Sequence, residues 1–335
     1  MKTGWERNKP LISPDDQTVT HMLQNFLNGR KIVHIELLGG GLSNSNLKII
    51  LENKETFVLR MYNESGLKAK IEMEVLELVE NILPVPRVLY HDFSLSQFNY
   101  PFLLLSWVKG FQLSQLFLTE DEASLSNAGY EVGKYLARMH SIQFTSPGFF
   151  DEHLNIQKFE LSGSESFKSL IDEMITGGAV TENLGSDMIH SITKFTTDKA
   201  HLLDDIGNQS SLVHSDFNPL NILIQKEGNS VNVTGILDWE FSFSNSPLID
   251  VGNMLRYENI QESSFIKPFI LSYLNNEGVL PQKWLQKAKL LDIIALLDLA
   301  NKNGCGAIRL RDIKELISKT MTEWELYSTV QETIK

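Results

Sequence analysis

The sequence predicts an α+β protein with two lobes, a small lobe rich in antiparallel strands and a larger lobe that is mainly helical. Residues 32–108 contain short runs of β-branched and alternating apolar residues, separated by glycine and asparagine, with one helical stretch among them. From residue 121 onward the apolar residues recur three and four apart, except between residues 211 and 238. We therefore place the small lobe at residues 1–108 and the large lobe at residues 109–335, with a hinge near residues 106–110.

The elements of the small lobe follow from local patterns. A helix is expected over residues 15–29, because Asp15 and Asp16 favour its amino terminus and the apolar residues that follow share one face. A second helix is expected over residues 68–83, where Pro84 stops the apolar period. The β-branched and alternating runs predict five strands, over residues 32–38, 47–51, 56–61, 87–92 and 102–108.

The large lobe carries the longer apolar periods. A β segment over residues 211–238 interrupts them, and no internal repeat or Pro-rich linker separates the two lobes. The periods predict helices over residues 121–142, 164–175, 182–206, 248–257, 263–276, 282–300 and 311–329.

Composition and charge exclude several classes of function. The 335 residues are 42% apolar and 21% charged, which is ordinary for a globular protein. Thirty Lys and Arg against 42 Asp and Glu leave a net charge of −12, so we expect no general binding to nucleic acid or to an anionic membrane. The single cysteine, Cys305, cannot form an internal disulfide, and the first residues lack the apolar core of a signal peptide. We expect a cytoplasmic protein, either a monomer or a homodimer.

A polar loop between two apolar runs is the most informative segment. It reads H-S-D-F-N-P-L-N from His214 to Asn221, with Asp216 and Asn221 five residues apart. A carboxylate can accept a proton from an attacking hydroxyl, and an amide oxygen can hold a hard cation such as Mg²⁺. Taken alone, these residues are equally well explained as turn formers.

The next strand-like run ends in a second carboxylate. Residues 231–237 are largely apolar, and Asp238-Trp239-Glu240 follows them. A carboxylate at the end of a buried strand is costly unless it is paired or bound to a cation. A D-x-x-x-x-N loop followed closely by an apolar strand ending in aspartate is the metal-binding pattern of kinase-like phosphotransferases. The two segments together favour the functional interpretation over the turn interpretation.

A glycine-rich turn lies upstream, between two predicted strands. It includes Gly40 and Gly41, whose lack of side chains lets backbone N–H groups approach phosphate oxygens, and Ser43, Asn44 and Ser45 can add donors. The turn is not a P-loop, because no Gly-Lys-Ser/Thr follows it. A hairpin turn without a ligand explains the same residues.

A cation and a helical glutamate complete the pattern. Arg60 ends the strand Phe57-Val58-Leu59, and two glutamates lie on the next predicted helix. A strand cation paired with a helix glutamate holds the α- and β-phosphates of the nucleotide in kinases. We choose Glu74 as that partner, because it precedes Val75 and Leu76, and we interpret Glu72 as surface charge.

These motifs, in this order, resemble the aminoglycoside phosphotransferase and choline kinase-like family, which shares the protein-kinase fold. The similarity spans residues 38–255 and rests on G-G-G-L-S-N, V-L-R, L-L-S-W-V-K-G, V-H-S-D-F-N-P-L-N-I-L and I-L-D-W-E. The resemblance implies that Asp216 is the catalytic base and that Asn221 and Asp238 bind Mg²⁺. It also implies that the backbone near Ser106 and Val108 meets the adenine.

The resemblance implies one structural residue and shows one departure. Asp250, in P-L-I-D-V-G, matches an aspartate that braces the catalytic loop, so we expect it to matter for folding. Arg60 stands where protein kinases have lysine, and arginine is larger and always charged. This departure leaves the preference between ATP and GTP open.

The sequence therefore predicts an ATP-dependent phosphotransferase that acts on a hydroxyl of a small molecule. Aminoglycosides, choline or ethanolamine, homoserine and methylthioribose are the acceptors that the resemblance implies. One alternative is a nucleotide-binding scaffold without catalysis, similar to a pseudokinase, and its only support is Arg60. A helical protein that acts only through interactions would leave the loop and strand motifs unexplained.

Overall fold

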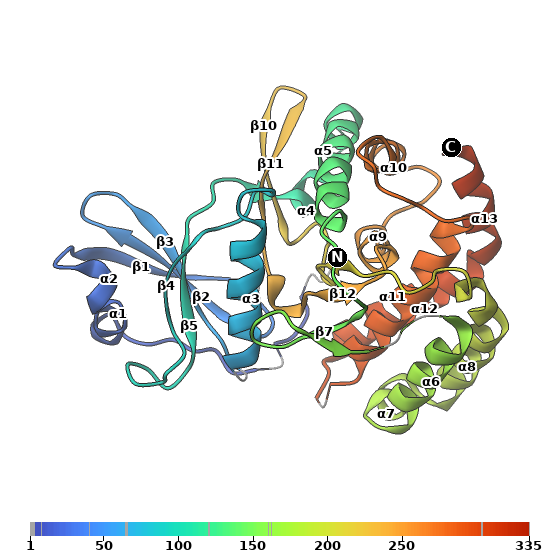
Figure 1. Cartoon of the computed structure of the whole chain (residues 1–335), viewed down its shortest axis with the longest axis horizontal. Helices are drawn as coiled ribbons and strands as arrows, with labels where there is room; N and C mark the ends of the chain where they lie inside the picture. Colours follow the sequence, from blue (N-terminus) through green and yellow to red (C-terminus); the bar gives the residue numbers. More distant parts are fainter. Residues whose placement is uncertain are drawn as a thin grey trace.

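The structure, a computed structural model, describes residues 4–7, 9–39, 41–63, 66–119, 121–159, 161, 163–302 and 304–334. It confirms the α+β, two-lobed fold class. Figure 1 shows a sheet with its helices at one end of the molecule and a larger, mainly helical lobe at the other. The division of the chain after residue 108 stays a prediction.

A five-stranded antiparallel sheet forms the amino-terminal lobe, in the order β1-β2-β3-β5-β4. One face packs against the short helices that precede the sheet, and helix α3 packs against the other. The elements are α1 (Asp16–Met22), α2 (Gln24–Leu27), β1 (Ile32–Leu38), β2 (Ser45–Leu51), β3 (Thr56–Met61), α3 (Gly66–Val79), β4 (Val88–Asp92) and β5 (Phe102–Ser106). All five predicted strands and the helix after the third strand are therefore confirmed.

The first predicted helix is divided in two. Leu23 leaves helical geometry, with φ −98° and ψ 5°, and its side chain is fully buried. The chain turns there so that both α1 and α2 place apolar residues on the sheet, Val19 and Met22 from α1 and Leu27 from α2. The apolar period alone did not reveal this break, because the break keeps the same residues buried.

The carboxy-terminal lobe is built mainly from helices that surround a buried core. Helices α5 and α10 cross closely at Gly129 and Gly133, where an added Cβ would collide with the backbone carbonyls of Phe265 and Phe269. The helices are α4 (Leu113–Leu116), α5 (Glu122–His140), α6 (Gly163–Thr176), α7 (Val180–Leu184), α8 (Ser186–Lys199), α9 (Leu248–Met254), α10 (Ile266–Asn275), α11 (Trp284–Ala300), α12 (Ala307–Thr322) and α13 (Trp324–Thr333).

Two small antiparallel sheets position the polar loop in this lobe. The first has the order β11-β10-β6, from β11 (Ser230–Ile236), β10 (Ile222–Glu227) and β6 (Phe111–Gln112). The second has the order β8-β7-β12-β9, from β8 (Ile156–Lys158), β7 (Gly148–Phe150), β12 (Phe243–Asn245) and β9 (Ser211–Val213). Strands of two or three residues give no periodic signal, so the sequence revealed neither β6 nor the strands outside residues 211–238.

The two sheets fix both ends of the loop that carries Asp216. The loop leaves β9 and enters β10, and Asp238 comes two residues after β11, the hairpin partner of β10. Within the described residues, no helix has the length and apolarity needed to cross a membrane.

Candidate active site

Two amides hold the carboxylate of Asp216. The Nδ2 atom of Asn218 donates to Oδ1 at 2.7 Å, and the Nδ2 atom of Asn221 donates to Oδ2 at 2.9 Å. Both amides also donate to the backbone carbonyl of Asp216. Because the carboxylate accepts from both sides, it is fixed in orientation while its residue stays only partly buried. Such a group can accept a proton from a hydroxyl placed before it.

A fully buried aspartate braces the start of this loop. The carboxylate of Asp250 accepts from the backbone N–H groups of His214, at 2.9 Å, and Ser215, at 2.8 Å. Ser215 has φ +68°, which is costly for a residue with a side chain. The paired acceptor atoms of Asp250 support this conformation, and His140 lies beside the same carboxylate at 3.2 Å.

Hydrogen bonds join the loop to the segment of Asp238. The backbone N–H of Leu237 donates to the carbonyl of Asn221 at 2.9 Å, and Nε2 of His214 lies 2.8 Å from the carbonyl of Leu237. The ring of Trp239 is fully buried against the ring of His214, with 4.6 Å between their centroids. The loop and the end of the β11 segment therefore form one rigid unit.

A buried arginine gathers three carboxylates, one from α3 and two from the segment that follows β11. Nε of Arg60, on β3, lies 2.9 Å from Oε2 of Glu72 on α3. Nη1 pairs with the carboxylate of Asp238, and Nη2 lies 3.4 Å from Oε1 of Glu240. Arg60 and Glu72 are almost completely buried, whereas the side chain of Asp238 is 37% exposed. Of the three, Asp238 is therefore the carboxylate that a solvent-borne cation can reach.

The prediction that Glu74 pairs with Arg60 is wrong. Glu72 makes the pair, and it also accepts a hydrogen bond of 2.6 Å from the hydroxyl of Tyr62. Glu72 lies three, four and seven residues before the buried Val75, Leu76 and Val79, which places it on the buried stripe of α3. The spacing in the sequence therefore indicated Glu72. Glu74 is adjacent to Val75, and adjacent residues of a helix point to different sides of it.

Burial and charge shift several pKa values in this cluster. Burial raises the pKa of Glu72, although Arg60 partly opposes the rise. Burial also raises the pKa of Glu240 to about 7. Burial alone would lower the pKa of Arg60, but the carboxylates of Asp238 and Glu72 more than offset it and hold this pKa well above its usual range.

The glycine-rich turn is linked to the same cluster. The side-chain amide of Asn44 donates to Oε1 of Glu240 at 2.8 Å, within the buried interior. The hydroxyl of Ser45 accepts from the backbone N–H of Ile12 at 2.9 Å. The side chains of Asn44 and Ser45 are thus engaged with the protein, while Gly40 lies outside the described residues.

Backbone N–H groups in the described part of the turn have no protein partner. Among the residues that the structure describes, the N–H groups of Leu42, Ser43 and Asn44 donate to no protein group. Successive backbone N–H groups in a turn make a concave site for anions. The turn can therefore offer backbone donors, as the sequence predicts, although the Asn44 amide is already used.

The segment after β5 links the two lobes. The hydroxyl of Ser106 accepts from the backbone N–H of Arg87 at 2.8 Å, and the N–H of Ser106 donates to the Arg87 carbonyl at 2.9 Å. The side chain of Val108 packs against Gly235 on β11. In the described part of the chain the backbone of Val108 makes no hydrogen bond, so its polar groups are open to a ligand.

Comparison with known proteins identifies the family. The family model described as the phosphotransferase enzyme family matches residues 34–283, about three quarters of the chain. The chain belongs to the phosphotransferase enzyme family. No curated protein matches the sequence of this phosphotransferase.

Solved structures confirm the fold of this phosphotransferase. The aminoglycoside phosphotransferase APH(4)-Ia is 14% identical with a TM-score of 0.65, and the match covers 94% of this chain and 99% of that one. The aminoglycoside 2'-phosphotransferase-IIIa, solved as a variant with GDP, is 16% identical with a TM-score of 0.66, over 95% and 98% of the two chains. An aminoglycoside phosphotransferase-like structure from Ralstonia eutropha JMP134 is 16% identical with a TM-score of 0.63, over 94% and 98%.

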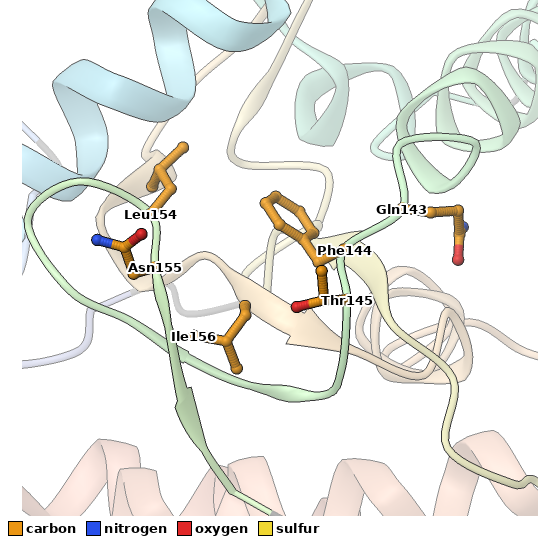
Figure 2. Close-up of a pocket in the computed structure, with 6 residues that line it drawn as sticks. All are labelled: Gln143, Phe144, Thr145, Leu154, Asn155 and Ile156. Atoms are coloured by element: carbon orange, nitrogen blue, oxygen red, sulfur yellow. The ribbon is translucent and has the colours of Figure 1, made fainter.

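A surface hollow of about 460 Å³ lies away from this machinery. Figure 2 shows that it is formed by the loops on either side of β7, in the carboxy-terminal lobe of the phosphotransferase. Its lining residues are Gln143, Phe144, Thr145, Leu154, Asn155 and Ile156. Among the described residues, no hydrogen bond or ion pair joins these six to Asp216, Asn221 or Asp238, so we do not assign the hollow to the candidate site.

The raised pKa of Glu240 predicts how stability depends on pH. The folded phosphotransferase holds the Glu240 proton up to about pH 7, whereas the unfolded chain releases it near pH 4.5. The ionised carboxylate therefore lowers stability progressively as pH rises through this window. We expect the difference in unfolding free energy between Glu240→Gln and the unchanged protein to grow by about 1–2 kcal/mol from pH 5 to pH 8, in favour of the variant. The ceiling for this change is ~1.4 kcal/mol for each unit by which the pKa is raised.

Urea denaturation at pH 5, 6, 7 and 8 measures this gain. Glu55→Gln is the matched control, because a hydrogen bond from Asn53 lowers the pKa of Glu55 and its titration lies below this range. The control should give a difference that stays constant from pH 5 to pH 8. A constant difference for Glu240→Gln as well would contradict the raised pKa.

Proposed function

We propose that this phosphotransferase transfers the γ-phosphate of Mg²⁺-bound ATP to a hydroxyl group of a small molecule. The observation that carries the proposal is the joint fixation of Asp216, Asn221 and Asp238. Asn221 donates to Asp216 through its side chain and accepts from Leu237 through its backbone. A proton acceptor and two oxygen ligands are thus held on one rigid unit, which is what phosphoryl transfer requires.

In this proposal Asp216 is the catalytic base. Its carboxylate orients the acceptor hydroxyl and takes the proton as the oxygen attacks the γ-phosphorus. The bond between the γ-phosphorus and the β–γ bridging oxygen breaks, and ADP leaves. The amides of Asn218 and Asn221 keep the carboxylate in place by donating one hydrogen bond to each oxygen. Positioning of this kind supplies much of the rate in phosphoryl transfer.

The residues at the loop fit a magnesium ion. Asn221 donates its Nδ2 hydrogens to Asp216, which leaves its Oδ1 atom free to face a cation. Asp238 offers a carboxylate that is partly exposed. Oxygen atoms of this kind are the ligands Mg²⁺ prefers, and the bound ion would neutralise charge on the nucleotide phosphates.

The nucleotide would lie between the glycine-rich turn and the segment after β5. Backbone N–H groups around Gly41 and Ser43 would meet phosphate oxygens, and the backbone of Val108 would meet the base. Arg60 takes part in the phosphate site through its pair with Glu72, which replaces the predicted pair with Glu74. Structures of related fold contain AMP-PNP, ADP and GDP, so ATP and GTP are both tested below.

The acceptor is a small molecule whose class the test must decide. Hygromycin B accompanies AMP-PNP in a structure of APH(4)-Ia, a protein of similar fold. The acidic residues of the large lobe give little support to a cationic acceptor, because each of them already has a protein partner. Asp205 pairs with Lys287, Glu258 accepts from Ser263, and Asp204 accepts from the backbone of Ser164.

The pairing of Arg60 speaks against the alternative of a scaffold without catalysis. It rested on arginine in the lysine position, yet Arg60 makes the ion pair with a helix carboxylate that such a lysine makes. The proton acceptor and both oxygen ligands are present together, which favours an active enzyme.

Release of ADP or GDP tests the proposal directly. The protein is incubated with Mg²⁺ and ATP or GTP across a panel of aminoglycosides, choline, ethanolamine, homoserine and methylthioribose. We expect turnover that depends on both Mg²⁺ and one class of hydroxyl acceptor. Nucleotide binding without turnover on any hydroxyl acceptor, across a panel extended to further sugars and amino alcohols, would contradict the proposed function.

A further inference from the structure

The first described residues dock on the carboxy-terminal lobe. The indole Nε1 of Trp5 donates to Oδ2 of Asp312, on α12, at 2.9 Å, and only 7% of Trp5 is exposed. The guanidinium of Arg309 lies over the Trp5 ring, 5.2 Å from its centroid. Oε1 of Glu6 accepts from the backbone N–H of Ile308 in the first turn of α12, at 3.3 Å. These contacts anchor the amino-terminal segment to α12.

Arg7, in the same segment, binds the glycine-rich turn. The guanidinium of Arg7 donates to the backbone carbonyls of Gly41, Ser43 and Asn44. The distances to Ser43 and Asn44 are 3.3 Å and 3.1 Å. One side chain therefore satisfies three acceptors in four consecutive residues, on the turn that the proposed function assigns to the phosphates.

Further hydrogen bonds fasten the segment to the amino-terminal lobe. The backbone N–H of Ile12 donates to the hydroxyl of Ser45, and Ile12 is buried. The amide of Asn63 donates to the carbonyls of Pro10, at 3.0 Å, and Ser43, at 2.8 Å. The segment thus connects α12 in one lobe with β2 and with Asn63, just after β3, in the other.

We propose that residues 4–7 and 9–12 form a strap that ties the glycine-rich turn to the carboxy-terminal lobe, and that Arg7 is a positioning residue for the nucleotide phosphates. The inference rests on the proposed function, since it assigns the turn to phosphate binding. Arg7 touches the carbonyls of the turn, so it acts through the backbone rather than on the nucleotide itself. With the carbonyls held, the free N–H groups of the turn keep one arrangement for the phosphate oxygens.

The chemistry of arginine suits this role. A planar guanidinium has five N–H donors in a rigid fork, whereas the ammonium of lysine is a single point with three. On the other side of the turn, Asn44 donates to Glu240. The turn is therefore held between Arg7 on the strap and Glu240 beside Asp238, the proposed metal ligand. A turn that is already ordered loses less conformational freedom when nucleotide binds.

Nucleotide affinity tests the role of Arg7 without any acceptor. We expect Arg7→Ala to weaken binding of Mg²⁺ and AMP-PNP, measured by calorimetry, by about tenfold to a hundredfold, the range for loss of hydrogen bonds to a charged group. In turnover assays the KM for ATP should rise by a similar factor while kcat changes less than about twofold, because the turn is disordered before binding but restored by it. Arg7→Lys should fall between the two proteins.

Arg30→Ala is the matched control. Arg30 also donates to backbone carbonyls of the amino-terminal lobe, those of Leu27 and Phe26, and it lies away from the turn. The control should lower the melting temperature to a similar extent and leave nucleotide affinity unchanged. The inference is overturned if Arg7→Ala binds AMP-PNP as tightly as the unchanged protein. It is also overturned if Arg30→Ala weakens binding as much as Arg7→Ala does.

The anchor on α12 gives an independent test of the strap. Trp5→Ala leaves every contact of Arg7 in place but removes the attachment to Asp312 and Arg309. We expect it to weaken AMP-PNP binding as well, and the effects of Trp5→Ala and Arg7→Ala should combine to less than their product. An unchanged affinity in Trp5→Ala would show that the Trp5 anchor on α12 does not help to hold the turn. Failure of the unchanged protein itself to bind nucleotide would instead overturn the proposed function.

Discussion

Replacement of Asp216 by asparagine is expected to lower kcat by about 10² to 10⁴-fold, the contribution typical of a general base. The amide cannot take the proton of the acceptor hydroxyl. It also places an NH₂ group against one of the two amides, from Asn218 and Asn221, that donate to the carboxylate. The variant should therefore lose the base together with one of the bonds that orient it. Turnover of the acceptor identified in the panel measures the loss.

Two further measurements separate loss of the base from loss of the fold. Nucleotide affinity should stay within about threefold, because Asp216 faces the acceptor rather than the phosphates. Asp151→Asn is the matched control: its carboxylate, on a loop of the same lobe, also accepts from an asparagine amide, that of Asn155. The control should keep full activity. Undiminished phosphate transfer by Asp216→Asn would remove Asp216 from the role of base.

The parts of the candidate site that the sequence revealed are those fixed by short-range pattern. Asp216 and Asn221 lie on one loop between two apolar runs, and Asp238 ends the next strand. Because β10 and β11 form a hairpin, the two segments had to meet, and the structure joins Asn221 to Leu237. Short-range pattern also predicted the five strands of the first sheet. On β2, for example, buried and less buried residues alternate, as expected for a strand with one face in the core.

The parts that the sequence did not reveal depend on contacts between distant residues. Arg7 lies 34 to 37 residues before the carbonyls that it binds, and nothing in its neighbourhood marks it. The bond between Asn44 and Glu240 spans 196 residues. Glu72 was a different kind of error, because its spacing to Val75 and Leu76 was visible and a neighbouring position was chosen instead.

Replacement of Arg60 by methionine is expected to destabilise the protein by about 3–5 kcal/mol near pH 8, the cost of leaving buried charges without a partner. Methionine fills a similar length with apolar atoms, so the loss reports charge more than packing. Glu72 and Glu240 are both buried and would face each other without the guanidinium. Urea denaturation measures the loss. Lys168→Met, which removes a cation paired with the exposed Glu165, should cost less than about 1 kcal/mol.

The pH dependence of this loss identifies its cause. Burial already raises the pKa values of Glu72 and Glu240 with Arg60 present, and removal of the cation would raise both further. Each carboxylate then takes up a proton in the folded state at a pH where the unfolded chain has released it. The deficit of Arg60→Met should therefore shrink as pH falls from 8 to 5. A deficit that is the same at both pH values would point to packing instead.

Removal of the carboxylates together with the arginine shows what the cluster is for. The combined variant Arg60→Met, Glu72→Gln, Glu240→Gln has no buried charge left among these three positions, so most of the lost stability should return. Asp238, partly exposed, keeps its carboxylate in every variant. If stability returns while affinity for Mg²⁺ and AMP-PNP does not, the buried charges serve the nucleotide rather than the fold. Recovery of both would remove Arg60 from the phosphate site and leave Asp238 and Asn221 to hold the metal without it.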